Sequence, residues 1–115
     1  GIELTINKEY QKAIEVLELA TKYMKTSALY THLGISYEEI ENYEKAKAAY
    51  ETSIHLVPHK FFPRYRLVFL YQKMGLKAEA IDLAKTILTT SAKINSEVVI
   101  GMKYEIRKFL KQYDY

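Results

Sequence analysis

Residues 30–37 read YTHLGISY and place a glycine inside a stretch whose other residues favour a helix. A glycine in a helix interior costs about 1 kcal/mol relative to alanine. Because glycine has no side chain, Gly34 predicts a point where another part of the chain comes very close to the helix backbone.

The sequence around Gly34 recurs with a period of about 34 residues. Identical residues lie 34 apart in the pairs Leu33 and Leu67, Tyr37 and Tyr71, and Ala46 and Ala80. Towards the N-terminus, Ala13 and Tyr10 precede Ala46 and Tyr43 by almost the same interval. The segments between turns have helical spacing, so each period predicts a pair of antiparallel helices.

The central unit resembles the tetratricopeptide repeat, whose pattern is W-x2-L-G-x2-Y, then A-x3-F, then P. The residues that carry the resemblance are Tyr30, Leu33, Gly34, Tyr37, Ala46, Tyr50 and Pro58. Tyrosine stands in for the tryptophan and for the phenylalanine. The resemblance implies an all-α superhelix of helical hairpins, in which Gly34 and Ala46 lie where the two helices of one hairpin meet.

We expect one domain of about two and a half repeats, taken from a longer protein. Its parts are a partial repeat at 1–26, repeats at 27–60 and 61–93, and a capping helix within 94–115. The expected helices span 8–24, 27–40, 43–57, 62–74, 77–90 and 97–112. Gly1 to Asn7 would be the tail of a partner helix that is mostly missing.

The last helix is expected to cap the stack, because an open repeat leaves an apolar face exposed. Asn95 or Ser96 can cap its N-terminus. Its apolar residues recur every three or four positions: Val99, Met102, Ile106, Phe109 and Tyr113. One side should pack on the third repeat while the other side meets water.

Composition argues against several classes of function. The net charge is only +3, with both signs interspersed, which predicts solvated helix faces and no nucleic-acid binding. The chain has no cysteine and no apolar run near ~20 residues. His55 and His59 are four apart, but Pro58 lies between them, so no metal site is expected. No Gly-rich phosphate loop or nucleophile motif occurs, so neither a cofactor nor catalysis is expected.

A narrower resemblance covers residues 54–110. This stretch is similar to the C-terminal repeat region of O-antigen ligase or polymerase-like membrane proteins of Bacteroidetes-type bacteria. The matching residues are Pro58, His59, Phe61, Pro63, Arg64, Tyr65, Leu70, Tyr71, Gly75, Ala80, Ala84, Ile87 and Leu88, and 92–94 replaces an extended piece. The resemblance implies an accessory domain in surface polysaccharide assembly, attached to the inner membrane on either its periplasmic or its cytoplasmic side. Sugar transfer would belong to membrane-embedded parts outside this chain.

In the repeat architecture, the first helix of each hairpin lines a concave groove. The expected groove floor consists of Thr31, Ile35, Glu38, Tyr65, Arg66, Phe69 and Gln72. Aromatic and aliphatic groups there can anchor a peptide or a helix. The alternative for Tyr65 and Phe69 is burial beneath the C-terminal helix or the neighbouring repeat. Arg64 and Arg66 flank these two rings, either solvated or facing an acidic partner.

The function expected from these features is that of a non-catalytic scaffold for a protein or peptide partner. The alternatives are a free-standing adaptor and a sugar-binding module that uses the same concave face. Tyr10, Ile14 and Leu17 fall on one helix face and are expected to support weak self-association.

Overall fold

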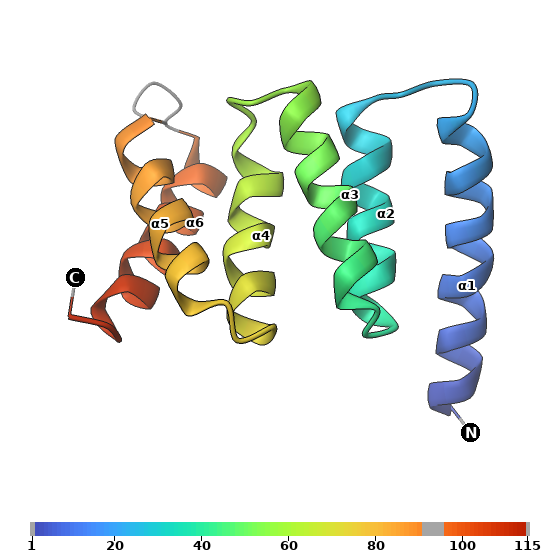
Figure 1. Ribbon diagram of the computed structural model, residues 1–115, viewed down its shortest axis with the longest axis horizontal. Helices are drawn as coiled ribbons and strands as arrows, with labels where there is room; N and C mark the ends of the chain where they lie inside the picture. The colour runs from blue at the N-terminus through green and yellow to red at the C-terminus, as the bar shows by residue number, and fades with distance from the viewer. Residues whose placement is uncertain (1, 91–95, 115) are drawn as a thin grey trace. The chain divides into compact units, whose positions relative to one another are not determined.

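The computed structural model describes the backbone of residues 2–90 and 96–114 and the side chains of residues 6–89 and 96–114. All regular structure in these residues is helical (Figure 1). The helices are α1 (Ile2–Thr21), α2 (Ser27–Glu39), α3 (Tyr43–Leu56), α4 (Phe61–Lys73), α5 (Lys77–Thr90) and α6 (Glu97–Lys111). The chain divides into two compact units, Gly1–Pro58 with α1 to α3 and His59–Tyr115 with α4 to α6. None of the described helices is both long and apolar enough to cross a membrane.

The helix pattern read from the sequence is confirmed for α2 to α6, whose ends lie within a residue of the expected positions. The expectation for the N-terminus is wrong. Residues from Ile2 onward belong to α1 itself and not to a separate partner helix, because no glycine or proline interrupts them. Gly1 and the expected extended piece at 92–94 lie outside the described residues.

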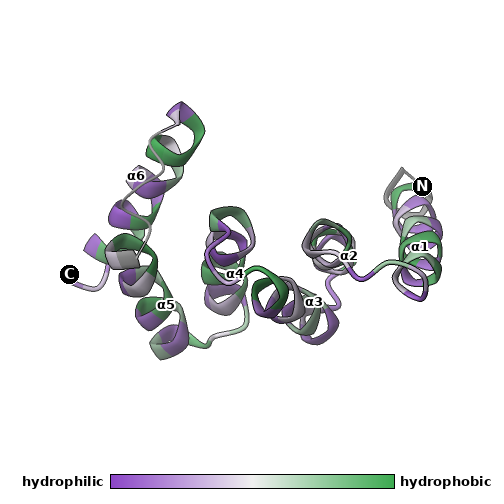
Figure 2. Ribbon diagram, turned by 90° about the horizontal axis from the view of Figure 1, so that it is seen from above, coloured by the Kyte–Doolittle hydropathy of each residue, from purple (hydrophilic) through white to green (hydrophobic). Residues whose placement is uncertain are grey.

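In the first unit, α1 packs beside α2, and α2 pairs with α3 (Figures 1 and 2). Thr26 caps α2 by accepting a hydrogen bond from the Leu29 amide at 3.2 Å. The side chain of Asn42 caps α3 in the same way. Such caps satisfy amides that have no partner inside the helix, and they explain why both helices begin where they do.

The close approach predicted at Gly34 is made by the ring of Tyr50 on the facing helix α3. A Cβ atom at position 34 would lie 2.6 Å from both Cδ1 and Cε1 of that ring. In the second unit, the residues one repeat period further on are Val68 and Ala84, and both are fully buried in one apolar cluster. The two hairpins therefore use opposite combinations of large and small residues at matching positions.

The interior of the first hairpin contains several hydrogen-bonded polar groups. The Tyr50 hydroxyl donates to Oε1 of Glu38 at 2.9 Å. The Ser53 hydroxyl lies 2.7 Å from the hydroxyls of Ser27 and Thr31, and all three residues are buried. Because a buried polar group is costly unless it is bonded, these contacts specify how α2 and α3 fit together.

The core of the second unit is apolar by comparison. Its buried residues are Phe61, Val68, Ala80, Ile81, Ala84, Ile87, Val99, Ile106, Phe109 and Leu110. The expected packing of α6 is confirmed, since Val99, Ile106 and Phe109 are buried and Met102 and Tyr113 pack against the cluster. Ser96 caps α6 by accepting from the Val99 amide at 3.2 Å.

The repeat-signature residues mostly lie in the interior. Leu33, Gly34, Tyr37, Ala46, Tyr50, Leu67 and Ala80 are buried, Ala13, Tyr30 and Tyr71 are half-buried, and Pro58 is exposed after the end of α3. Ala46 and Ala80 are fully buried, and Gly34 lies against the side-chain ring of Tyr50.

The two hairpin turns have the same backbone geometry. Glu41 has φ of 62° and Gly75 has φ of 76°, and these two positions are one repeat period apart. The next amide in each turn donates back to a tyrosine carbonyl: Asn42 to Tyr37 and Leu76 to Tyr71, each at 2.9 Å. A residue in the left-handed conformation just after a helix is usually glycine. Of the two turns, only the second has glycine at this position.

Replacing Glu41 by glycine should stabilise the chain by about 1 kcal/mol, because it removes the strain of a side chain at positive φ. Urea denaturation followed by helical circular dichroism would measure the gain. The matched substitution Gly75→Ala should destabilise by a similar amount. Equal stability of all three chains would contradict this account of the turns.

Candidate interaction surfaces

The α2 part of the expected groove is largely engaged inside its own hairpin. Thr31 is buried, and its hydroxyl donates to the Ser27 carbonyl at 2.9 Å. Glu38 is also buried and accepts from Tyr50. Ile35 is half-buried. The open face of α2 lies one residue further along, at His32 and Glu39, which are both exposed.

An open hollow of about 460 Å³ lies between α1 and α2. It is lined by Lys12, Ala13, Val16, Leu17, His32 and Ser36. The walls from α1 are mainly aliphatic, and Val16 is 67% exposed. The hollow offers space for an apolar side chain, with a lysine and an imidazole beside it. None of these residues belongs to the groove floor expected from the sequence.

The N-terminal face expected to self-associate is already used inside the first unit. Ile14 is only 5% exposed, and Tyr10 and Leu17 are half-buried. The exposed large apolar residues of α1 are Ile6, Val16 and Leu19, and the last two lie three positions apart on another face of the helix. A helix face cannot be assigned from apolar spacing alone when both sides of the helix carry apolar residues.

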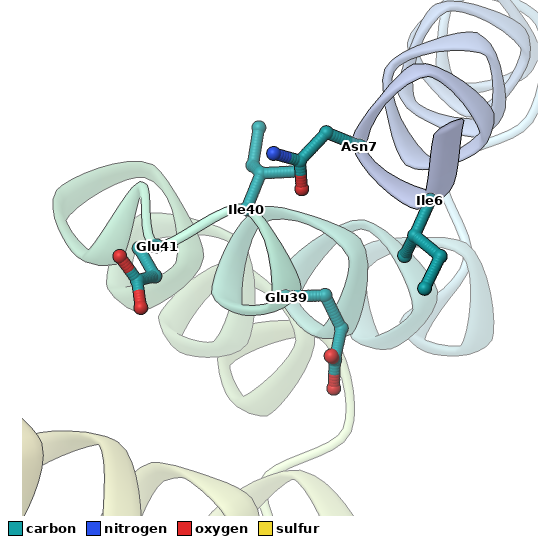
Figure 3. Close-up of a pocket in the computed structure, with 5 residues that line it drawn as sticks. All are labelled: Ile6, Asn7, Glu39, Ile40 and Glu41. Atoms are coloured by element: carbon teal, nitrogen blue, oxygen red, sulfur yellow. The ribbon is translucent and has the colours of Figure 1, made fainter. Parts of the chain in front are cut away.

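A second hollow, of about 320 Å³, lies where the C-terminal end of α2 approaches α1 (Figure 3). It is lined by Ile6, Asn7, Glu39, Ile40 and Glu41. The carboxylates of Glu39 and Glu41 point in different directions and do not converge on one point. Within the described part of the chain, no group of three or more His, Cys, Asp or Glu side chains could hold a metal ion.

In the second unit, Tyr65 and Phe69 belong to a continuous series of aromatic rings. Consecutive ring centroids are 6.5 Å apart from Phe62 to Tyr65, 5.2 Å from Tyr65 to Phe69, 5.8 Å from Phe69 to Phe109 and 5.3 Å from Phe109 to Tyr113. The last two rings belong to the C-terminal part of the chain. Phe69 is therefore in contact with the C-terminal helix, which was one of the two alternatives for it.

Arg64 is buried, so the expectation that it is solvated or meets an acidic partner in the groove is wrong. Its side chain is 5% exposed, and Nε and Nη2 donate to the carbonyls of Lys60 and His59 at 3.2 and 3.1 Å. Burial lowers the pKa of the guanidinium. By contrast, Arg66 is half-buried and Gln72 is exposed.

Sequence reasoning also missed the exposed apolar residues on α6. The outer side of this helix is open to water as expected, but it carries the large apolar residues Val98, Ile100 and Tyr104, which are 70%, 54% and 61% exposed. Their signal in the sequence is the presence of large apolar residues on both sides of one helix.

Comparisons with known proteins agree with the fold. Residues 27–58 match the family model of the tetratricopeptide repeat, which places this repeat on the hairpin of α2 and α3. The chain is 29% identical over 115 residues to the pre-mRNA-splicing factor cwf4 of Schizosaccharomyces pombe (strain 972 / ATCC 24843). That alignment takes in 96% of this chain but only 17% of the splicing factor.

A chain of the solved CopN-Scc3 complex has a similar fold, with a TM-score of 0.79 at 22% sequence identity. The match covers 91% of this chain and 61% of that chain. The all-α repeat fold predicted from the sequence is thereby confirmed. At this identity the likeness concerns the fold alone.

Proposed function

We propose that this chain is a non-catalytic scaffold that binds a protein partner through the hollow between α1 and α2. The observation that carries the proposal is the mainly aliphatic hollow of about 460 Å³ on the surface of a tetratricopeptide-like unit. Burial of apolar surface is the main driving force of protein association.

The arrangement around the hollow suits an inserted side chain of a peptide or helix. Ala13, one helical turn before the larger Val16 and Leu17, contributes only a methyl group to the lining. His32 and Lys12 lie at the same hollow and can bond polar groups of the partner backbone. An apolar anchor surrounded by polar contacts is the usual anatomy of a protein interface.

Selection of peptides from a random library on the immobilised chain would supply ligands for a test. Peptides selected in this way should shift the NMR signals of Val16, Leu17 and His32. Val16→Glu should weaken their binding about tenfold or more, since a charge would replace an apolar contact. The melting temperature should stay nearly unchanged, because Val16 is 67% exposed.

Val98→Glu is the matched control, because this valine is 70% exposed on α6 and does not line the hollow. It should leave the binding of the selected peptides unchanged. Equal losses from both variants, or signal shifts confined to other helices, would count against the hollow as the binding site.

The parent protein can be proposed from the narrower sequence resemblance of residues 54–110. In that proposal the chain is the accessory C-terminal domain of an O-antigen ligase or polymerase-like membrane protein of a bacterium, and it is held at the inner membrane. What supports it is the run from Pro58 to Tyr71 followed by Gly75, Ala80 and Ala84. Catalytic residues for sugar transfer would then lie outside this chain.

Sequencing the DNA upstream of residue 1 tests this parentage. About ten hydrophobic spans in the same reading frame would support it. A further run of helical repeats without such spans would instead favour a free-standing adaptor. The similarity to a splicing factor is consistent with that second reading.

A further inference from the structure

Helix α1 buries little of its surface in the first unit. Among its described side chains, which run from residue 6 to residue 21, only Ile14 is buried, at 5% exposed. Helices α2 and α3 each bury several residues. Because local stability rises with the apolar surface that an element buries, α1 is the most weakly held helix of this unit.

Two hollows border the contact between α1 and α2. The first is the hollow of about 460 Å³ described above. The second, of about 280 Å³, is lined by residues of α1, α2 and α3, and those from α1 are Glu18 and Thr21. Since there is open space beside α1, few neighbouring side chains have to move when this helix leaves α2.

Among the described side chains of α1, that of Glu18 is hydrogen-bonded to another helix. The hydroxyl of Tyr37, a residue that is 8% exposed, donates to Oε1 of Glu18. The ammonium of Lys45 on α3 lies 5.7 Å from the centre of the same tyrosine ring. Tyr37 therefore contacts groups from both other helices of the unit, and its hydroxyl is the polar link to α1.

The hairpin of α2 and α3 is held by a separate set of bonds. The Tyr50 hydroxyl donates to Glu38 at 2.9 Å, and the Ser53 hydroxyl lies 2.7 Å from those of Ser27 and Thr31. All of these residues belong to α2 or α3. None of these bonds is therefore lost when α1 moves away.

We propose that α1 detaches from α2 and unfolds while the hairpin of α2 and α3 stays folded. A helix without tertiary contacts is only marginally stable in water, so the detached segment loses its helical hydrogen bonds. The α1 side of the larger hollow consists of Lys12, Ala13, Val16 and Leu17, so detachment also removes this hollow. The chain thus presents and withdraws its candidate binding surface without unfolding as a whole. The consequence for binding rests on the proposed function, whereas the detachment itself does not.

Hydrogen exchange of single amides in the intact chain, measured by NMR at increasing urea concentrations, tests the proposal. Amides around Ile14 in the middle of α1 should exchange at least about tenfold faster than amides around Tyr50. Their exchange should also depend less on urea, because opening of α1 exposes less surface than unfolding of the whole unit. Equal rates and equal urea dependence at the two places would overturn the proposal.

Two variants that each remove one tyrosine hydroxyl extend the test. Tyr50→Phe loses a bond inside the hairpin, which stays intact when α1 detaches. It should therefore speed exchange in α2 and α3 about tenfold and leave exchange in α1 unchanged. Faster exchange of α1 in Tyr50→Phe would mean that α1 opens only together with the hairpin, which contradicts the proposal.

Tyr37→Phe is the matched variant, because it loses the bond to Glu18 and keeps the aromatic ring. This bond is absent both after α1 detaches and after the whole unit unfolds. Exchange in α1 and in the hairpin should therefore become faster by the same factor, about tenfold. An unchanged rate in α1 would overturn the role assigned to the Tyr37 hydroxyl.

These measurements need no ligand, so they are independent of the experiment on the hollow. If the selected peptides do not bind the hollow, the proposed function fails and the separate opening of α1 still stands. If α1 exchanges only together with the hairpin, the separate opening fails and the hollow is still a candidate binding site.

Discussion

Replacing Gly34 by valine should destabilise the chain by about 3 kcal/mol, at the upper end of the range for overpacked cores. The first atom of any side chain at this position would lie 2.6 Å from the Tyr50 ring. That ring is fully buried, and its hydroxyl is bonded to Glu38, so it has little freedom to move aside. Urea denaturation of the full chain, followed by helical circular dichroism, measures the loss.

The control is Gly101→Val, where the new Cβ atom would meet nothing within 4 Å. It should change stability by less than about 0.5 kcal/mol. A loss of equal size at both glycines would show that the effect at Gly34 does not come from the Tyr50 ring.

The second hairpin suggests a substitution that compensates for the stability lost in Gly34→Val. Val68 and Ala84 occupy there the positions of Gly34 and Tyr50. Tyr50→Ala alone should cost about 3 to 5 kcal/mol, as for other large buried aromatic residues. Gly34→Val combined with Tyr50→Ala should cost at least about 1 kcal/mol less than the sum of the two single changes. Strict additivity would mean that the two positions do not share one packing space.

Phe109→Ala should cost about 3 to 5 kcal/mol and loosen α6 from its unit. Phe109 is 2% exposed, and its ring lies between those of Phe69 and Tyr113, at centroid distances of 5.8 and 5.3 Å. Hydrogen exchange read by mass spectrometry should show faster exchange of the α6 amides. The Phe69 side chain should become more accessible to solvent.

Tyr104→Ala serves as the comparison, because it removes an aromatic ring of the same helix that is 61% exposed. Its effect on stability should stay within about 0.5 kcal/mol. Normal protection of the α6 amides in Phe109→Ala would contradict the role assigned to the aromatic contact.

Much of the fold was predictable because the residues that start and end its helices act locally. Asn42, Gly75 and Ser96 stand at turns or caps, and they set where helices end and begin. Gly34 predicted a close approach, which the Tyr50 ring makes, and Ala46, expected at the meeting of the two helices of the same hairpin, is fully buried. The repeat period then related one hairpin to the next.

The candidate site was less predictable. Which side chains reach the surface depends on how each helix is rotated about its own axis, and the repeat pattern does not determine that rotation. One residue along a helix turns its side chain by roughly 100°. That difference separates buried Thr31 from exposed His32 and buried Glu38 from exposed Glu39. Arg64 was misassigned for another reason: its carbonyl partners at His59 and Lys60 come from a helix start whose geometry the sequence does not show.

The interior around Ser53 is held by hydrogen bonds between hydroxyls, whereas the interior around Ile106 is apolar. The stability of the two units should therefore depend differently on temperature. Apolar association weakens as water is cooled, whereas hydrogen bonds between hydroxyls have no such dependence on hydration entropy. Near freezing, the half of the chain that holds α4 to α6 should therefore lose more of its resistance to denaturants than the half that holds α2 and α3. A protein built from one repeated hairpin would in this way carry two different thermal responses.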